Sequence, residues 1–445
     1  MFDRFSLSVL LGSAAGRHAQ PSKMTTPLRI QIDTLAYGAH GVGRLDGKAT
    51  FVRGVIPGEQ VEIVVREDHG RYAYADLIAV LEPAAERRHP PCPYLPRCGG
   101  CPWQHMEYEA QLAAKQRNLR ETLARIGHWR DAPVKPIVAS ASEFQYRSRL
   151  SLRIHERRLG FYAAGSHELV EIDHCLLATD AINDALVAAA ELVRLVPDDA
   201  RRVEVLTCER TAAIVLVAEV EGSRNPATSA LIDAWLPQQA VAGVVLHGRR
   251  WRQAWGRQSV SVYPEPDLEL TATAGSFTQV NPSANRELVR HVLELGEFSP
   301  QDHVLDLYAG IGNLSLPIAR RAQRVVAVEQ NALAAGDARV NARAAKLANV
   351  EVHTATTRSA LRALSAQRAR FDVVVLDPPR SGAAEAIDAV LTLAPERIVY
   401  VSCNPATLAR DLAKLLPSFA FDVIQPVDLF PQTYHLETVA RGRRR

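Results

Sequence analysis

The stretch VLDLYAGIGN, residues 304–313, decides the fold predicted for this chain. An apolar run ends at Leu307, and Gly310 and Gly312 follow where the chain turns into a helical pattern. Glycines at such a junction let the backbone approach a ligand closely. The third glycine of a pyrophosphate-binding turn is missing, because Ser315 stands in its place. The turn therefore predicts a ligand site, but not a dinucleotide cradle.

From this stretch onward, short apolar runs alternate with helical patterns. The predicted strands include residues 303–307, 324–328, 371–376 and 397–401, and the predicted helices include 313–322 and 332–346. This alternation predicts an α/β domain with a parallel sheet and helices on both faces. Glu329 closes one strand, where a carboxylate can accept hydrogen bonds from both hydroxyls of a ribose. Alone, Glu329 would be a solvent-exposed carboxylate; together with the glycine turn it favours a nucleoside site.

Two further regions precede this domain. Apolar runs separated by glycine-rich turns predict a small OB-like β-barrel over residues 28–82, a fold that often binds RNA. Residues 90–270 predict an α+β region with helices near 106–126 and 180–196. We therefore expect a barrel domain at 24–84, a central domain at 85–270 and the α/β domain at 271–445.

The composition is that of a soluble globular protein of two or three domains: 445 residues, 47% hydrophobic and 23% charged. A net charge of +3 is too small to indicate a nucleic-acid partner by itself. Grouped arginines fit phosphate contacts and a solvated surface equally well. The groups are Arg147, Arg149, Arg153, Arg157 and Arg158; Arg249, Arg250, Arg252 and Arg257; and Arg443, Arg444 and Arg445.

No stretch is long and apolar enough to predict a membrane span. Residues 1–23 contain only a short apolar run, and Asp3 balances Arg4 before it. A weak secretory signal is the alternative, but we expect a disordered or spurious leader before Met24 and a cytoplasmic protein.

Cys403 is the best candidate for a nucleophile. It lies in YVSCNP, residues 400–405, after a predicted strand, and Pro405 suits the first turn of a helix. A thiol at a helix N-terminus is biased toward the thiolate. The alternative, a buried apolar cysteine, fits Cys208 in its apolar run better than it fits Cys403 in its polar turn.

Two other motifs offer partners for that thiol. Glu437, in PQTYHLETV at 431–439, is a candidate general base provided that burial raises its pKa, and His435 is its rival. Phe277, in FTQVN at 277–281, offers an aromatic face on which a base can stack.

The glycine turn resembles that of the class I (Rossmann-like) methyltransferases, in which S-adenosylmethionine lies across the carboxyl ends of the strands. The resemblance implies that Gly310 and Tyr308 lie near this cofactor, that Asn313 caps the following helix and that Glu329 holds the ribose. Asp377 opens DPPR, residues 377–380, at another strand end, where ligand-facing groups are expected.

An aromatic residue after the two prolines of this motif would suggest methylation of an exocyclic amine, and Arg380 stands there instead. Together, FTQVN, DPPR, SCNP at 402–405 and HLET at 435–438 resemble the ordered motifs of the RNA uracil-5-methyltransferases. That family adds a thiolate to carbon 6 of uracil, so that carbon 5 can take a methyl group. The resemblance makes Cys403 the nucleophile, Glu437 the base and Gln279 a cofactor-site residue. Thr356 departs from the family, which often has an asparagine near the adenine.

Three cysteines form the pattern Cys92-x5-Cys98-x2-Cys101, and Cys175 is a plausible fourth ligand. Four thiolates suit a 4Fe-4S iron–sulfur cluster or structural zinc. Zinc sites more often contain two close Cys pairs, so this arrangement favours iron–sulfur. The 23S rRNA branch of the family carries such a cluster and an N-terminal TRAM barrel, which residues 28–82 resemble.

The resemblance thus implies a monomeric 23S rRNA (uracil-5-)-methyltransferase with no membrane or obligate protein partner. The same reaction on tRNA or on another rRNA uridine is the nearest alternative. A radical enzyme would need a Cys-x3-Cys-x2-Cys triplet, and a non-catalytic RNA-binding module would not need both Cys403 and Glu437.

Overall fold

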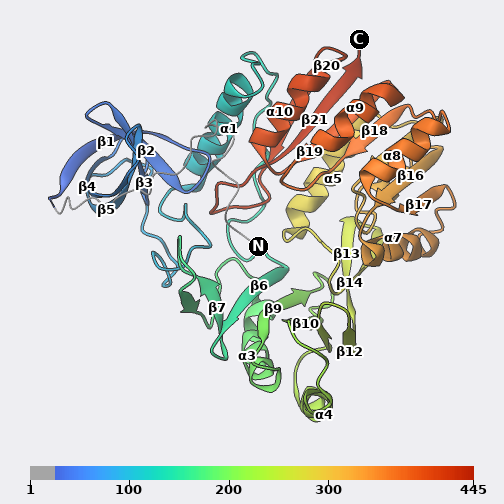
Figure 1. The fold of residues 1–445 in the computed structure, drawn as a ribbon, viewed down its shortest axis with the longest axis horizontal. Coiled ribbons are helices and arrows are strands. Elements are labelled where there is room, and N and C mark those ends of the chain that lie inside the picture. The colour runs from blue at the N-terminus through green and yellow to red at the C-terminus, as the bar shows by residue number, and fades with distance from the viewer. Residues whose placement is uncertain (1–25) are drawn as a thin grey trace. The chain divides into compact units, whose positions relative to one another are not determined.

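The computed structural model describes residues 26–445 (Figure 1), so the expected leader at 1–23 lies outside the described residues. The chain divides into two compact units, one ending at Arg87 and the other running from Arg88 to Arg445. Among residues 26–445, no helix combines the length and apolar character that a membrane crossing requires.

The N-terminal unit contains a closed five-stranded barrel with the strand order β1-β2-β3-β5-β4. Its strands are β1 (Leu28–Leu35), β2 (His40–Leu45), β3 (Lys48–Arg53), β4 (Gln60–Asp68) and β5 (Tyr72–Glu82). Alternate residues such as Ile30, Ile32, Val61 and Ile63 face the interior, which confirms the predicted barrel.

In the second unit, a seven-stranded sheet has the order β12-β11-β10-β9-β6-β7-β8. Its strands are β6 (Arg149–His155), β7 (Arg158–Tyr162), β8 (Leu169–Glu171), β9 (Ala200–Thr207), β10 (Ile214–Val220), β11 (Gly243–His247) and β12 (Arg252–Gly256). One face packs against α2 (Asp180–Asp184), α3 (Leu186–Leu195) and α4 (Pro226–Trp235). The other face packs against the hairpin of β13 (Ser259–Glu265) and β14 (Leu268–Thr273).

A second seven-stranded sheet has the order β17-β16-β15-β18-β19-β21-β20. Its strands are β15 (His303–Leu307), β16 (Arg324–Glu329), β17 (Val350–Thr354), β18 (Val373–Leu376), β19 (Arg397–Ser402), β20 (Phe419–Val427) and β21 (Glu437–Arg444). The first five are parallel, and β21 runs antiparallel to both of its neighbours.

Helices cover both faces of this sheet, as the alternating pattern predicts. One face packs against α8 (Thr357–Ala366), α9 (Ala384–Leu393) and α10 (Pro405–Leu415), which lie side by side in Figure 1. The other face packs against α5 (Pro282–Gly296) and α6 (Ser315–Ala319), and α7 (Ala332–Ala344) packs beside β14 and β17.

Helix α1 (Tyr108–Arg125) departs from the predicted domain organisation. Its buried Leu119 and Leu123 join the core formed by α10 and the α/β sheet, instead of the core of the central sheet. The segment after α1 continues along that sheet, where Val134 and Val138 form isolated bridges to β20. Residues 108–138 therefore pack with the α/β domain, although the chain enters the central sheet only after them.

Candidate active site

Polar side chains gather at one edge of the α/β sheet. The parallel strands β15, β16, β18 and β19 end there, with Tyr308, Glu329, Asp377 and Cys403 at or just beyond their last residues. Because β21 is antiparallel, it begins at this same edge with Glu437. Ser402, the last residue of β19, pairs with Thr438 of β21. The residue after Ser402 therefore lies beside the residue before Thr438. The register therefore places Cys403 next to Glu437.

The glycine turn after β15 is tied to the end of β16 by one carboxylate. Glu329 accepts a hydrogen bond from the backbone N–H of Gly310 at 2.9 Å and one from that of Asn331 at 2.7 Å. Gly310 has a φ of 58°, and a Cβ there would meet no atom within 4 Å, so the space beside the turn is open. A Cβ on Gly312 would instead collide with Leu316. The turn thus has the open approach expected of a ligand site.

Asp306 lies inside strand β15, near the candidate site, and its carboxylate was not predicted from the sequence. It is 1% exposed and accepts a hydrogen bond from the hydroxyl of Ser315, while its other oxygen has no partner. Burial, together with the charges of Asp377 and Glu329, raises the pKa of Asp306 to about 7. An acidic residue within an otherwise apolar strand was the signal that could have identified it.

The helix cap expected at Asn313 is wrong. Helix α6 begins at Ser315, and its N-cap residue is Leu314, which provides no side-chain cap. The amide of Asn313 instead exchanges two hydrogen bonds of 2.9 Å with the amide of Asn285 on α5. A buried amide that finds a complementary amide satisfies both donors and acceptors, so this pairing replaces the cap and ties α5 to the turn.

Cys403 lies between β19 and α10, one residue before the N-cap Asn404. Burial, followed by the negative charges of Glu437 and Asp377, raises the pKa of its thiol to about 12 against the opposing charge of Arg380. This direction is opposite to the thiolate bias expected from a helix N-terminus. The reason is that desolvation and two nearby carboxylates outweigh a dipole that is effective only over the first turn.

Glu437 and His435 titrate in opposite directions from their ordinary pKa values. Glu437 is 2% exposed, and burial raises its pKa well above the usual range, as does Asp377. Burial likewise raises the pKa of Asp377 to about 7. Burial and the nearby Arg380 lower the pKa of His435 to about 3, and its Nε2 lies 3.4 Å from the Arg380 guanidinium. An imidazole that resists protonation this strongly is a weak base.

The loop that contains His435 and leads to Glu437, residues 428–436, is anchored by helix α1. The ammonium group of Lys115 lies 2.7 Å from the carboxylate of Asp428, and both side chains are fully buried. Lys115 also donates to the carbonyl of Phe430 at 3.0 Å, and the hydroxyl of Tyr108 donates to Asp428 at 3.0 Å. Sequence reasoning missed this network, because its partners are far apart in the chain.

The comparisons with known proteins identify the family. Residues 107–442 match the tRNA (uracil-5-)-methyltransferase family, and residues 25–78 match the TRAM domain. The chain belongs to the tRNA (uracil-5-)-methyltransferase family. It is therefore a uracil-5 RNA methyltransferase with an N-terminal TRAM barrel, and the predicted fold class is confirmed.

Several relatives of this methyltransferase span nearly its whole length. A protein of Thiobacillus denitrificans named 23S rRNA (uracil(1939)-C(5))-methyltransferase RlmD is 33% identical, covering 92% of this chain and 98% of that protein. The protein of the same name from Dechloromonas aromatica is 34% identical, with 92% and 98% coverage. An uncharacterized RNA methyltransferase of Gloeobacter violaceus is 34% identical, with 96% and 98% coverage.

A solved structure has the same fold as the uracil-5 methyltransferase described above. The tRNA (uracil-54, C5)-methyltransferase of Pyrococcus abyssi, in complex with S-adenosyl-L-homocysteine, matches with a TM-score of 0.72 and 24% identity. The match covers 93% of this chain and all of the other.

The methyltransferase presents FTQVN in the segment between β14 and α5. Phe277 is 67% exposed, so its ring is available for stacking, and Gln279 is half-buried. Asn281 caps α5 by accepting from the N–H of Ala284 at 3.1 Å. Thr356 caps α8 by accepting from the N–H of Ser359 at 3.2 Å, so its hydroxyl has a structural role.

The four cysteines of the expected metal site lie in one neighbourhood of the methyltransferase. All four are free thiols, and mutual charge repulsion contributes to raising the pKa values of Cys98, Cys101 and Cys175, after burial. The two segments meet where the backbone N–H of Asp173 donates to the Tyr94 hydroxyl at 3.1 Å. Within residues 26–445, however, no three Cys, His, Asp or Glu side chains are arranged to hold a metal ion.

Proposed function

We propose that this enzyme transfers a methyl group from S-adenosylmethionine to carbon 5 of a uridine in 23S rRNA through a covalent Cys403–uracil adduct. The supporting observation is the pairing of β19 with β21, which sets a half-buried thiol beside a buried carboxylate of raised pKa. The relatives named RlmD support ribosomal RNA as the substrate.

The residues around the glycine turn fit the cofactor. The open space beside Gly310, the carboxylate of Glu329 and the unpartnered buried oxygen of Asp306 suit a ligand that carries hydroxyl and ammonium donors. Tyr308, Gln279, Asn313 and Asp377 would complete its surroundings. The bound cofactor supplies an electrophilic methyl group on a sulfonium.

Each step of the proposed reaction uses groups at this edge of the sheet. The thiol of Cys403 gives its proton to solvent, and the thiolate sulfur adds to carbon 6 of the uracil that is stacked on Phe277. The resulting enolate uses the electron pair at carbon 5 to accept the methyl group. Glu437, as the carboxylate, then takes the proton from carbon 5, the double bond between carbons 5 and 6 forms again, and the thiolate leaves.

The buried carboxyl groups make this proton transfer chemically reasonable. Glu437 and Asp377 raise each other's cost of ionisation, so the two together retain a proton near neutral pH. A carboxylate of raised pKa is a stronger base than a solvated one.

The experiment that tests the substrate compares 5-methyluridine in ribosomal RNA and tRNA from cells with and without the gene. We expect one uridine of 23S rRNA to lose its methyl group. Loss of 5-methyluridine from tRNA alone would contradict the proposed substrate and leave the uracil-5 chemistry in place.

We further propose that Cys92, Cys98, Cys101 and Cys175 hold a 4Fe-4S cluster. Four free thiols close enough to repel one another are a suitable donor set, and the positive charge of Arg147 opposes the rise that burial causes in the pKa values of Cys101 and Cys175. Anaerobic purification followed by iron, sulfide and zinc analysis tests this proposal. A colourless protein that holds one zinc ion would contradict it.

A further inference from the structure

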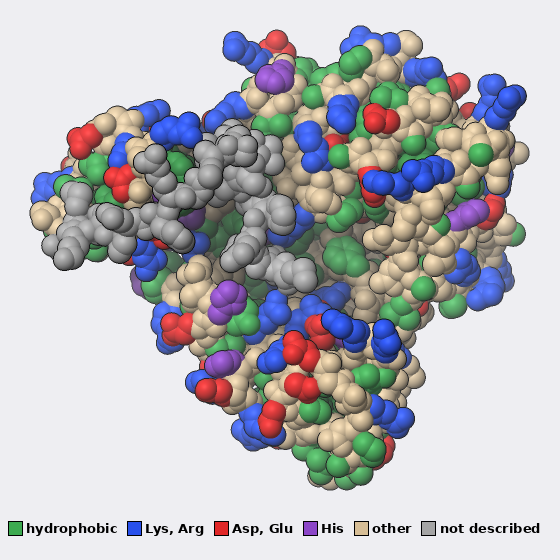
Figure 2. Space-filling model, viewed as in Figure 1, with side chains coloured by type: hydrophobic (Ala, Val, Ile, Leu, Met, Phe, Trp, Pro, Cys, Tyr) green, Lys and Arg blue, Asp and Glu red, His purple; other side chains and the backbone are tan. Residues whose placement is uncertain are grey.

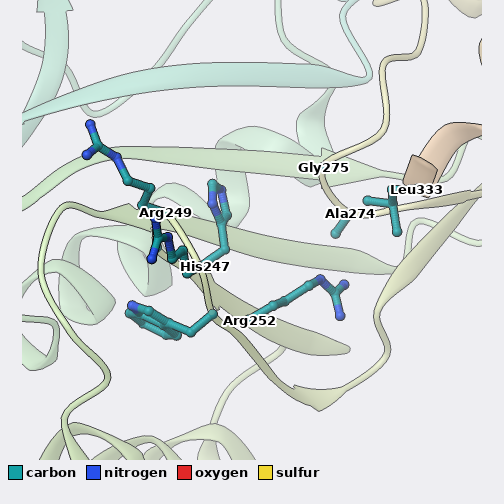
Figure 3. A pocket seen from close by; sticks show the side chains of 9 residues that line it. His247, Arg249, Arg252, Ala274, Gly275 and Leu333 are labelled. Carbon is teal, nitrogen blue, oxygen red and sulfur yellow. The ribbon is translucent and has the colours of Figure 1, made fainter. Parts of the chain in front are cut away.

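A cavity of about 430 Å³ opens beside the region that presents Phe277 (Figure 3). One side is the turn between β11 and β12, and the other is formed by Ala274, Gly275 and the first turn of α7. Its lining residues are His247, Gly248, Arg249, Arg250, Trp251, Arg252, Ala274, Gly275 and Leu333.

The cavity is strongly cationic, and its arginines lack direct ion pairs. Arg249, Arg250 and Arg252 are all exposed, and none of them forms an ion pair with any acidic residue of the described chain, 26–445. Two nearby carboxylates already have other partners: Glu219 pairs with Arg202 at 2.9 Å, and Glu221, on which Arg249 also acts electrostatically, pairs with Arg201 at 2.9 Å. Elsewhere acidic and basic side chains are interspersed over much of the face in view (Figure 2).

The turn that carries these arginines is held in one conformation. The backbone N–H of Gly248 donates to the carbonyl of Trp251 at 3.0 Å, and the indole N–H of Trp251 donates to the carbonyl of Gly222 at 2.8 Å. Arg252 donates to the side-chain carbonyl of Gln258 at 2.7 Å, so a neutral group orients its guanidinium. Figure 3 shows that this guanidinium extends toward the side formed by Ala274, Gly275 and Leu333.

The position of the cavity indicates its ligand. Gly275 is two residues before the exposed ring of Phe277, and Leu333 lies in the first turn of α7, whose positive dipole end adds to the cationic field. An RNA chain whose base stacks on Phe277 must place its neighbouring phosphates close to this segment. Arginine forks match phosphate oxygens in charge and geometry.

We propose that this cavity, formed by the β11–β12 turn, Gly275 and Leu333, binds the phosphodiester backbone of the RNA next to the nucleotide that stacks on Phe277. The proposal rests on the proposed function, because it assumes an RNA substrate at that ring. It assigns the binding of the flanking backbone to Arg249 and Arg252, leaving catalysis to Cys403 and Glu437.

The test measures how binding of a fluorescein-labelled, protein-free 23S rRNA transcript depends on salt. For single-stranded RNA, each phosphate contact contributes about 0.7 to the slope of log K against log salt concentration. The double variant Arg249→Gln/Arg252→Gln should therefore lose about 1.4 from this slope. The Arg249→Lys/Arg252→Lys variant should keep most of the slope, because the charges remain.

A charge-matched control removes two arginines that already have acidic partners. Arg290→Gln/Arg324→Gln changes the net charge by the same amount, but each of these arginines forms an ion pair, with Glu287 and Glu351 respectively. This control should bind RNA with the wild-type slope. An equal loss of slope in the control, or no loss in the cavity variant, would overturn the proposal.

Two further measurements distinguish the proposed phosphate site from a cofactor site and from the proposed function. Calorimetric binding of S-adenosylhomocysteine and thermal melting should be unchanged in the cavity variant; a loss of cofactor affinity would mean that the cavity serves the cofactor. If the slope falls as expected but the wild-type enzyme methylates no uridine, the proposed function fails and the phosphate site stands. If methylation is intact and the slope is unchanged, only the phosphate site fails.

Discussion

At the scale of single residues, the proposed mechanism depends on the sulfur of Cys403. Replacing Cys403 with Ala should reduce methyl transfer below detection, because no other thiol adjoins Glu437 and carbon 5 would lack its activating adduct. With RNA that contains 5-fluorouridine, the wild-type enzyme should form an adduct stable in a denaturing gel and the variant none. Unchanged binding of S-adenosylhomocysteine serves as the folding control. Full activity of the Cys403→Ala variant would rule out Cys403 as the nucleophile.

In the proposed mechanism, Glu437 acts in the second half of the reaction. Replacing it with Gln keeps the shape but removes the base, so turnover should fall by about 10²- to 10⁴-fold, and a methylated protein–RNA adduct should accumulate. Gel mobility after single-turnover reaction measures the adduct. His435→Asn is the matched control, since the low pKa of His435 makes it a weak base. If Glu437→Gln turns over normally and His435→Asn does not, the assignments are reversed.

Asp306 should make stability depend on pH. Its folded pKa of about 7 lies above the ordinary value of 3.8, so the protonated form favours the folded state. The contribution is fully present below about pH 4 and is lost as the pH rises through about 7, with an upper limit of about 4 kcal/mol. Asp306→Asn should remove this loss, measured as the difference in unfolding free energy between the two proteins at about pH 4 and about pH 8, which bracket the window. Parallel pH profiles would contradict the raised pKa.

At the scale of elements, helix α1 anchors the loop 428–436, which leads to Glu437. Lys115→Met should lower the free energy of unfolding by about 3–5 kcal/mol, because Asp428 stays buried without its cation. Urea denaturation measures the loss. Lys115→Met/Asp428→Asn removes both charges and should recover much of it. A single variant as stable as the wild type would show that the pair contributes nothing.

At the scale of the whole molecule, the boundary between the two units lies after Arg87, three residues beyond the predicted end of the barrel domain. Glu59, which is fully buried, accepts from Arg87 at 2.7 Å and from the N–H of Ile56 at 2.7 Å. A fragment of residues 24–87 should therefore be more stable than one of residues 24–84, by about 3–5 kcal/mol, because the shorter one leaves a buried carboxylate unpaired. Thermal melting of the two fragments checks this, with Arg87→Gln in the longer fragment as control. Equal stability of the two fragments would support a domain boundary after residue 84.

The sequence alone determined those features that depend on neighbouring residues. The glycine turn at 310–312, the alternation of strands and helices and the strand end before Cys403 are local, because backbone freedom and hydrophobic periodicity act over a few residues. The barrel was predictable for the same reason, since alternating apolar residues and turn glycines specify short strands.

The tertiary structure alone decided which of these residues meet and how they titrate. The antiparallel register of β21 brings Glu437 beside Cys403. Asn285 of α5 forms hydrogen bonds with the amide of Asn313, and Lys115 of α1 pairs with Asp428 in the loop 428–436. Burial also reverses the expected bias of the Cys403 thiol. Strand register, desolvation and long-range pairing depend on the packing of segments that lie 28 to 313 residues apart in these examples, which no local pattern encodes.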